Sequence, residues 1–188
     1  MLYPGEEQPA ASFEAVREAR LELRAGDILT ACDNELAVPD GYLGHSAIAV
    51  DGDYIVEAVI SFPYVQLART VQFFRAHPKC AVYRPVNPAM GLSAARYAYQ
   101  YYSFCDYNYK MGLSYPPFSF SSRIPLNDPW TSIYCSKLIW NSYYYGAGYA
   151  LKNDFGLFTP EDLDTFLTSD PHFVRLYRHP AFMFHVDT

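Results

Sequence analysis

Apolar and polar positions follow helical or alternating spacing along most of the chain, which predicts a mixture of short helices and strands. The clearest pattern is a pair of apolar runs on either side of Asp51-Gly52-Asp53, which predicts a β-hairpin. Strands are predicted over 27–31, 45–50, 54–59, 81–83 and 173–177. Helices are predicted over 12–24, 71–77, 88–102 and 134–145, and from Thr159 onward.

Residues 111–133 interrupt this pattern, since they are rich in Ser, Pro and aromatic residues and show no periodicity. A loop of that length within a compact domain is usually functional, for example as a lid or a binding loop. No internal repeat or linker divides the chain, so we predict one domain over 1–188. Helices interspersed with hairpin-linked strands favour an α+β fold with a mainly antiparallel sheet.

Composition and charge narrow the possible functions. The 188 residues include 14 Lys+Arg and 20 Asp+Glu, a net charge of −6, which argues against a nucleic-acid-binding protein. Hydrophobic residues make up 51% and no apolar run approaches the length of a membrane span, so we expect a folded globular chain. The N-terminus carries acidic residues where a secretory leader has basic ones, so a cytoplasmic location is expected unless a leader has been removed.

Cys135 is the strongest candidate nucleophile. It opens the apolar helix that is predicted around it, where unsatisfied N–H groups and the helix dipole favour thiolate over thiol. The thiolate is the form that attacks carbonyl carbons, and the amides of the same helical turn can hold the resulting oxyanion. For an isolated cysteine in an apolar helix, however, a buried structural role is more common.

His45 and Glu57 strengthen the hypothesis of a nucleophilic site. His45 begins one strand of the predicted hairpin, and Glu57 interrupts the other, apolar strand, where an acid is costly unless it is paired. A turn with an odd number of residues places the two side chains on one face, directly or diagonally opposite, whereas a two-residue turn separates them. On one face, Glu57 would orient the imidazole so that its other nitrogen takes the Cys135 proton. Taken singly, a packed histidine and an outward-facing acid are the commoner roles.

Four segments, in this order, resemble a known family. They are Gly26-Asp27-Ile28-Leu29, Gly44-His45-Ser46-Ala47-Ile48-Ala49-Val50, Val56-Glu57-Ala58 and Tyr134-Cys135-Ser136-Lys137-Leu138-Ile139. Together they resemble the circularly permuted NlpC superfamily, which comprises papain-like cysteine hydrolases of the YiiX/YebB-like type. In ordinary NlpC enzymes the cysteine helix precedes the histidine strand, whereas here the order is His, acid, Cys.

The resemblance implies a papain-like fold in which an antiparallel sheet packs against the helix that bears Cys135. It further implies Cys135 as nucleophile, His45 as base and Glu57 as the third member of a triad that hydrolyses amide bonds without a metal or an organic cofactor. The implied substrate is a small peptide or amide, with cell-wall peptides as the leading expectation. Lys137 departs from the family, which usually has Glu or Gly there, and this changes the charge two residues after the nucleophile.

Three tyrosines are candidate substrate-binding residues, namely Tyr42, Tyr107 and Tyr134. Tyr107 lies in Asp106-Tyr107-Asn108-Tyr109, which resembles a stretch of the same family, and an ordinary half-buried tyrosine is an equally good interpretation. The other cysteines have neither CxxC nor Cys/His ligand spacing, so a metal site is not expected. We interpret Cys32, Cys80 and Cys105 as packing residues.

Two rival functions stay open at this point. Relatives of the superfamily include lecithin retinol acyltransferase-like enzymes, and the many aromatic residues around 97–109 and 143–145 are compatible with an acyl channel. An apolar tunnel beside Cys135 would favour acyl transfer, and a short polar cleft would favour peptide cleavage. The second rival is a non-catalytic binding module on the same fold, which a buried Cys135 would favour.

Overall fold

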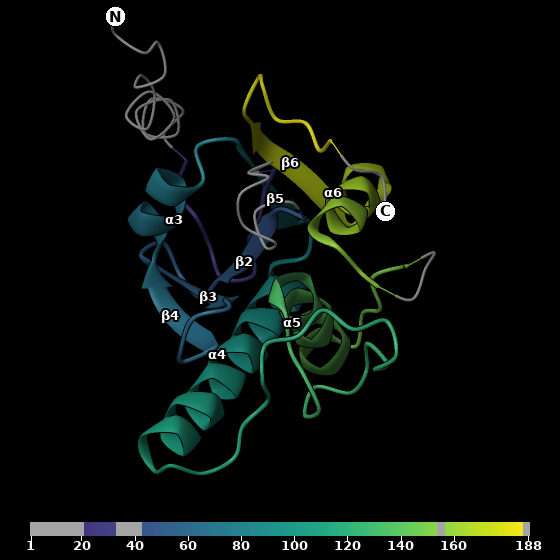
Figure 1. The fold of residues 1–188 in the computed structure, drawn as a ribbon. Helices are drawn as coiled ribbons and strands as arrows, with labels where there is room; N and C mark the ends of the chain where they lie inside the picture. Colours follow the sequence, from purple (N-terminus) through teal and green to yellow (C-terminus); the bar gives the residue numbers. More distant parts are fainter. Residues whose placement is uncertain (1–20, 33–42, 154–156, 186–188) are drawn as a thin grey trace, which may run out of the picture.

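A single six-stranded sheet forms the centre of the molecule (Figure 1). The computed structural model describes residues 21–32, 43–153 and 157–185, and the structural statements below refer to these. The strand order is β4-β3-β2-β1-β5-β6, and every neighbouring pair is antiparallel. The strands are β1 (Ile28–Ala31), β2 (His45–Ala49), β3 (Tyr54–Ala58), β4 (Val65–Arg69), β5 (Cys80–Pro85) and β6 (Phe173–Arg178).

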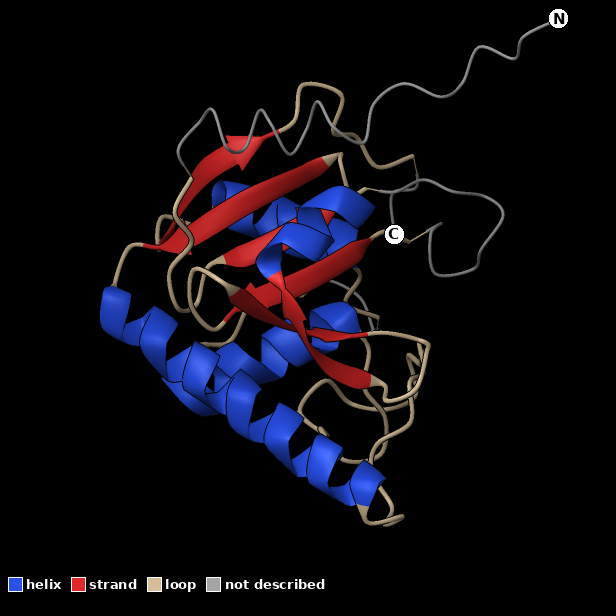
Figure 2. Ribbon diagram, turned by 90° about the vertical axis from the view of Figure 1, so that its left-hand side faces the viewer, coloured by secondary structure: helices blue, strands red, loops and turns tan. Residues whose placement is uncertain are grey.

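Helices cover both faces of the sheet. They are α3 (Thr70–Ala76), α4 (Pro88–Lys110), α5 (Cys135–Asn141), the π-helix η1 (Ser142–Gly146) and α6 (Pro160–Ser169). Ile48 and Val56 share a core with residues of α4, α5 and α6, whereas Ala47 and Ile55 point to the other side, against Phe73 of α3. Figure 2 shows the long helix α4 running beneath the sheet. The predicted α+β fold with an antiparallel sheet packed on helices, the Cys135 helix among them, is confirmed.

Local sequence accounts for most element boundaries. Asn87 caps α4 by accepting a hydrogen bond from the Ala89 amide at 3.0 Å, and Pro88 occupies the first helical position. Thr159 caps α6 in a capping box with Asp162. No helix of the described residues is both long and apolar enough to cross a bilayer.

Three expectations about elements need correction. Helix α4 continues eight residues beyond the predicted end at 102, because Cys105 and Asn108 extend its buried side. Strand β4 was not predicted, since its sequence, VQLAR, has one fully buried position. The predicted helix over 12–24 lies mostly outside the described residues, and residues 21–24 within them are not helical.

The loop over 111–133 lacks regular structure, as predicted, apart from one bridge between Phe118 and Ile133. Its end is tied to the helices by tyrosines: the Tyr101 hydroxyl donates to the Pro129 carbonyl, and the Tyr145 hydroxyl donates to the Asn127 carbonyl. The loop is therefore held against the helical layer immediately before the chain enters α5.

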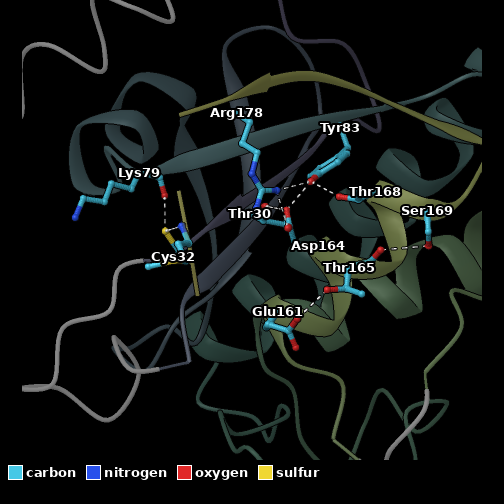
Figure 3. A network of polar contacts seen from close by, with 11 residues as sticks. Thr30, Cys32, Lys79, Tyr83, Glu161, Asp164, Thr165, Thr168, Ser169 and Arg178 are labelled. Carbon is cyan, nitrogen blue, oxygen red and sulfur yellow. Dashed lines mark hydrogen bonds and ion pairs between the residues drawn. The ribbon is translucent and has the colours of Figure 1, made fainter. Parts of the chain in front are cut away.

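A buried polar network fixes α6 to the sheet (Figure 3). Asp164 accepts hydrogen bonds from Tyr83 at 2.6 Å, from Thr30 at 3.1 Å and from Arg178 at 2.9 Å. Burial, followed by the negative charge of Asp164, raises the pKa of Tyr83 to about 12, so this hydroxyl remains a donor at physiological pH. Asp164 thus joins β1, β5 and β6 through one carboxylate.

Candidate active site

The β2–β3 hairpin brings His45 and Glu57 together. Ala47 pairs with Glu57, and the Val50 amide donates to the Tyr54 carbonyl at 2.8 Å, so the turn has three residues. The Asp51 carboxylate fixes this turn by accepting from the amides of Asp53 and Tyr54. An odd turn places His45 and Glu57 diagonally on one face. His45 Nε2 lies 2.8 Å from Glu57 Oε2.

The His45 ring lies in a largely buried site, since the side chains of His45 and Glu57 are 13% and 14% exposed. Burial is the largest influence and lowers the pKa of His45, but hydrogen bonds with Cys135 and Glu57, and the negative charges of both, outweigh it. The net effect is to raise the pKa of His45 to about 10. The ring therefore carries a proton at neutral pH.

Cys135 is the first residue of α5, and two contacts with Phe158 hold the chain at this point. The Ser136 hydroxyl donates to the Phe158 carbonyl at 2.6 Å, and the Phe158 amide donates to the Tyr134 hydroxyl at 3.3 Å. The thiol is 1% exposed, so a substrate needs a local opening to reach it. This burial is the feature that favours the binding-module rival.

Two aromatic side chains of α3 and its C-cap pack on the His45 ring. Phe73 stacks with the ring centroids 5.8 Å apart, and the His77 ring lies 4.8 Å away. Phe73 and His77 also contact each other at 4.7 Å. Sequence reasoning assigned no role to His77, because nothing in the sequence links residue 77 to a strand that begins at residue 45.

The three candidate substrate-binding tyrosines lie in different places. Tyr134 is buried, and its ring packs 4.9 Å from Phe120 of the 111–133 loop. Burial raises the pKa of Tyr134, so its hydroxyl stays protonated. Tyr107 is exposed near the end of α4. Tyr42 lies outside the described residues.

Lys137 is fully buried, although it is only two residues from Cys135. Its amine has no hydrogen-bond partner among the described residues, and neither polar atom of the Asn141 side chain, one turn later, has one. Burial lowers the pKa of Lys137, and the charge of Asp128 opposes that effect. Cys105 is buried as well, and burial raises the pKa of its thiol to about 12, which fits a packing role.

Within the described residues, no group of three or more His, Cys, Asp or Glu side chains is arranged to hold a metal ion. None of the four cysteines, all of which are described, forms a disulfide. The site offers one thiol, one imidazole and one carboxylate, the groups from which a nucleophile, its base and an orienting acid can be built.

Comparisons with known proteins found one similar fold and one matching family. The chain is similar to the crystal structure of metalloprotein yiiX from Escherichia coli O157:H7, with a TM-score of 0.50 and 19% identity, over 85% of this chain and 99% of that one. This is a likeness of fold, and it is consistent with a YiiX-like, papain-like architecture. No curated protein matches the sequence. The model of the family described as lipoprotein N-acylation protein LnsA-like matches residues 5–178, so the chain belongs to the LnsA-like family.

Proposed function

We propose that this protein is a thiol acyltransferase in which Cys135 carries the acyl group as a thioester and passes it to an amine. The observation that carries the proposal is the 2.8 Å contact of His45 with Glu57, together with a Cys135 thiol near enough to raise the pKa of His45, in a chain of the LnsA-like family. That family is described by lipoprotein N-acylation, which consumes an acyl donor and forms an amide on a lipoprotein.

The chemistry needs two steps that use the same three side chains. In the first, the Cys135 thiolate attacks the carbonyl carbon of an acyl ester, and the protonated His45 gives its proton to the alcohol that leaves. In the second, an amine attacks the thioester, neutral His45 takes the amine's proton, and Cys135 leaves as thiolate. Glu57 accepts a hydrogen bond from His45 Nε2 throughout and so orients the ring toward sulfur.

The proposal differs in its acceptor from a cysteine peptidase or amidase, for which water takes the acyl group. The order His45, Glu57, Cys135 along the chain, on a sheet packed against α5, supports a permuted NlpC-type relationship and with it this second candidate function. Both enzymes form the same thioester. The acceptor therefore separates the two functions, and the family description favours an amine.

The test measures acylation of Cys135 directly. The purified protein is mixed with a short-chain phospholipid as acyl ester, and the intact mass is recorded before and after addition of a lipopeptide with a free N-terminal amine. We expect an acyl adduct that hydroxylamine removes, and its transfer to the lipopeptide. Cys135→Ala abolishes the adduct, whereas the matched control Cys105→Ala, which alters a buried thiol of raised pKa, retains it.

Each other outcome identifies a rival. Release of free acid at the same rate with and without the amine indicates a hydrolase, and cleavage of a peptide amide without ester turnover indicates the peptidase. An unmodified protein, together with a Cys135 thiol that resists small alkylating reagents, indicates the binding module, as its 1% exposure allows.

A further inference from the structure

We propose that the end of α4 and the β3–β4 connection form a surface that docks on an anionic lipid bilayer. This lipid-facing surface consists of Ile60, Phe62, Tyr107, Tyr109, Met111 and Leu113. The biological role of this surface rests on the proposed acyl transfer, since an acyl ester in a membrane must reach Cys135. Docking itself is measured without turnover.

The six side chains are between 44% and 65% exposed, although all are large and apolar or aromatic. Such residues are common singly on a protein surface, whereas several together mark a binding surface. Figure 1 shows α4 extending away from the sheet, with its C-terminal end at the outer limit of the molecule. A flat partner can therefore approach this end of the helix.

A chain of ring contacts shows that the two segments belong to one surface. Phe62 lies 4.4 Å from Tyr64, Tyr64 lies 5.9 Å from Tyr115, and Tyr115 lies 6.0 Å from Tyr109. The β3–β4 connection thus contacts the start of the 111–133 loop, which in turn contacts the last turn of α4. These contacts link Phe62 to Tyr109, which are more than forty residues apart in the sequence.

The charge of this end of the molecule favours a lipid surface of negative charge. Residues 58–65 and 106–127 build this end and contain one of the 20 acidic residues of the chain, Asp106, which accepts from the Lys110 ammonium at 2.7 Å. Their basic residues are Lys110 and Arg123, so their net charge is 2 − 1 = +1 in a chain of net charge −6. Basic side chains beside apolar ones are what attract a protein to anionic lipid.

The residue types fit a bilayer interface. Tyrosine places an apolar ring among acyl chains and a hydroxyl among headgroups, and the surface contains Tyr107 and Tyr109 beside Phe62 and Met111. No helix of the described residues can span the bilayer, so contact from one side is the mode that this part of the chain offers.

The surface adjoins the candidate active site. Glu57 lies in β3, and Ile60 follows it by three residues, at the end of the sheet where β2 begins with His45. On the other side, the 111–133 loop leads through Phe118 and Phe120 to Tyr134, whose ring packs on Phe120. Docking therefore brings lipid to the end of the molecule that holds the thiol.

The experiment is sedimentation of the full chain with vesicles of phosphatidylcholine, alone or mixed with phosphatidylglycerol. We expect binding to the mixed vesicles that weakens with salt. The variant Phe62→Ser/Met111→Ser/Leu113→Ser should bind roughly a thousandfold more weakly, because burying each of the three side chains contributes about a factor of ten. The matched control Val86→Ser/Val174→Ser/Met183→Ser alters exposed apolar residues of similar exposure elsewhere and should bind like the wild type.

The outcomes separate docking from catalysis. Cys135→Ala should bind vesicles like the wild type. A wild type that binds vesicles but forms no acyl adduct overturns the proposed function alone. Docking is overturned if the wild type binds neither vesicle, or if the two triple variants bind equally well while circular dichroism shows both folded. A dimer in analytical ultracentrifugation that the Phe62 triple variant dissociates would assign the surface to a second copy and also overturn it.

Discussion

Replacement of Glu57 by Gln tests whether His45 is charged in the folded protein. The pKa of His45 is raised from 6.5 to about 10, and each pKa unit corresponds to 1.36 kcal/mol, so the charged ring is favoured by about 5 kcal/mol in the folded state. Cys135 and Glu57 share this effect. Glu57→Gln keeps the shape and removes the charge, so we expect it to lower the free energy of unfolding by about 2–3 kcal/mol near neutral pH.

The sign of the pH dependence follows from the raised pKa. Below pH 6.5 the ring is protonated in both folded and unfolded chains, and the stabilisation by its partners is fully present; it is lost as the pH rises through about 10. The difference between wild type and Glu57→Gln should therefore be largest near pH 6.5, shrink steadily between pH 6.5 and 10, and be lost above pH 10. Apart from Glu57 itself, the titratable groups are common to both chains and cancel.

Urea unfolding at several pH values measures this difference. The matched control is Asp53→Asn, which removes an exposed carboxylate from the turn of the same hairpin and should change stability by less than about 0.5 kcal/mol at every pH. If Glu57→Gln destabilises equally at neutral and alkaline pH, or not at all, His45 is not held as a cation and the reasoning fails.

Three further variants test neighbouring features. His77→Phe keeps an aromatic ring beside His45 and should leave the alkylation rate of Cys135 and its pH profile unchanged. His77→Ala should slow alkylation by roughly tenfold. Equal alkylation rates in the two variants would show that the ring contact does not position His45. Lys137→Met removes a buried, unpartnered amine and should raise the free energy of unfolding by about 1–3 kcal/mol in urea, so a loss of stability would indicate a partner for the amine. Asp164→Asn leaves Arg178 without its carboxylate and should lower that free energy by about 3–5 kcal/mol without altering Cys135 alkylation, and a slower alkylation would link the network to the site.

The sequence predicts the hairpin well, because two apolar runs flank Asp51-Gly52-Asp53. It leaves the turn length open, and the three-residue turn of the structure is what places His45 and Glu57 on one face. His45 and Glu57 are only twelve residues apart, so local geometry suffices to bring them together. Cys135 lies ninety residues beyond His45, and its position depends on how α5 packs on the sheet. The resemblance to a known family can suggest that Cys135 lies near His45, but the periodicity of apolar residues cannot.

Other features depend on tertiary packing, which leaves no local signal. The buried side of α4 continues through Cys105 and Asn108, yet the stretch from Tyr99 to Tyr109 is too evenly aromatic to reveal which side that is. Burial of Lys137 contradicts the usual preference of lysine for solvent and could not be expected from its neighbours. His77 reaches His45 only because α3 follows β4 and packs over the face that bears the hairpin residues.

The burial of Cys135 has different consequences for a hydrolase and for an acyltransferase. A hydrolase needs water at the thioester, whereas an acyltransferase must keep water away until the amine arrives. A thiol that is 1% exposed, beside an imidazole that is 13% exposed, limits water in the resting protein. The proposed lipid-facing surface around Phe62 would bring acyl chains to this end of the molecule. The burial of Cys135 therefore fits the proposed transferase at a lipid surface better than it fits the peptidase.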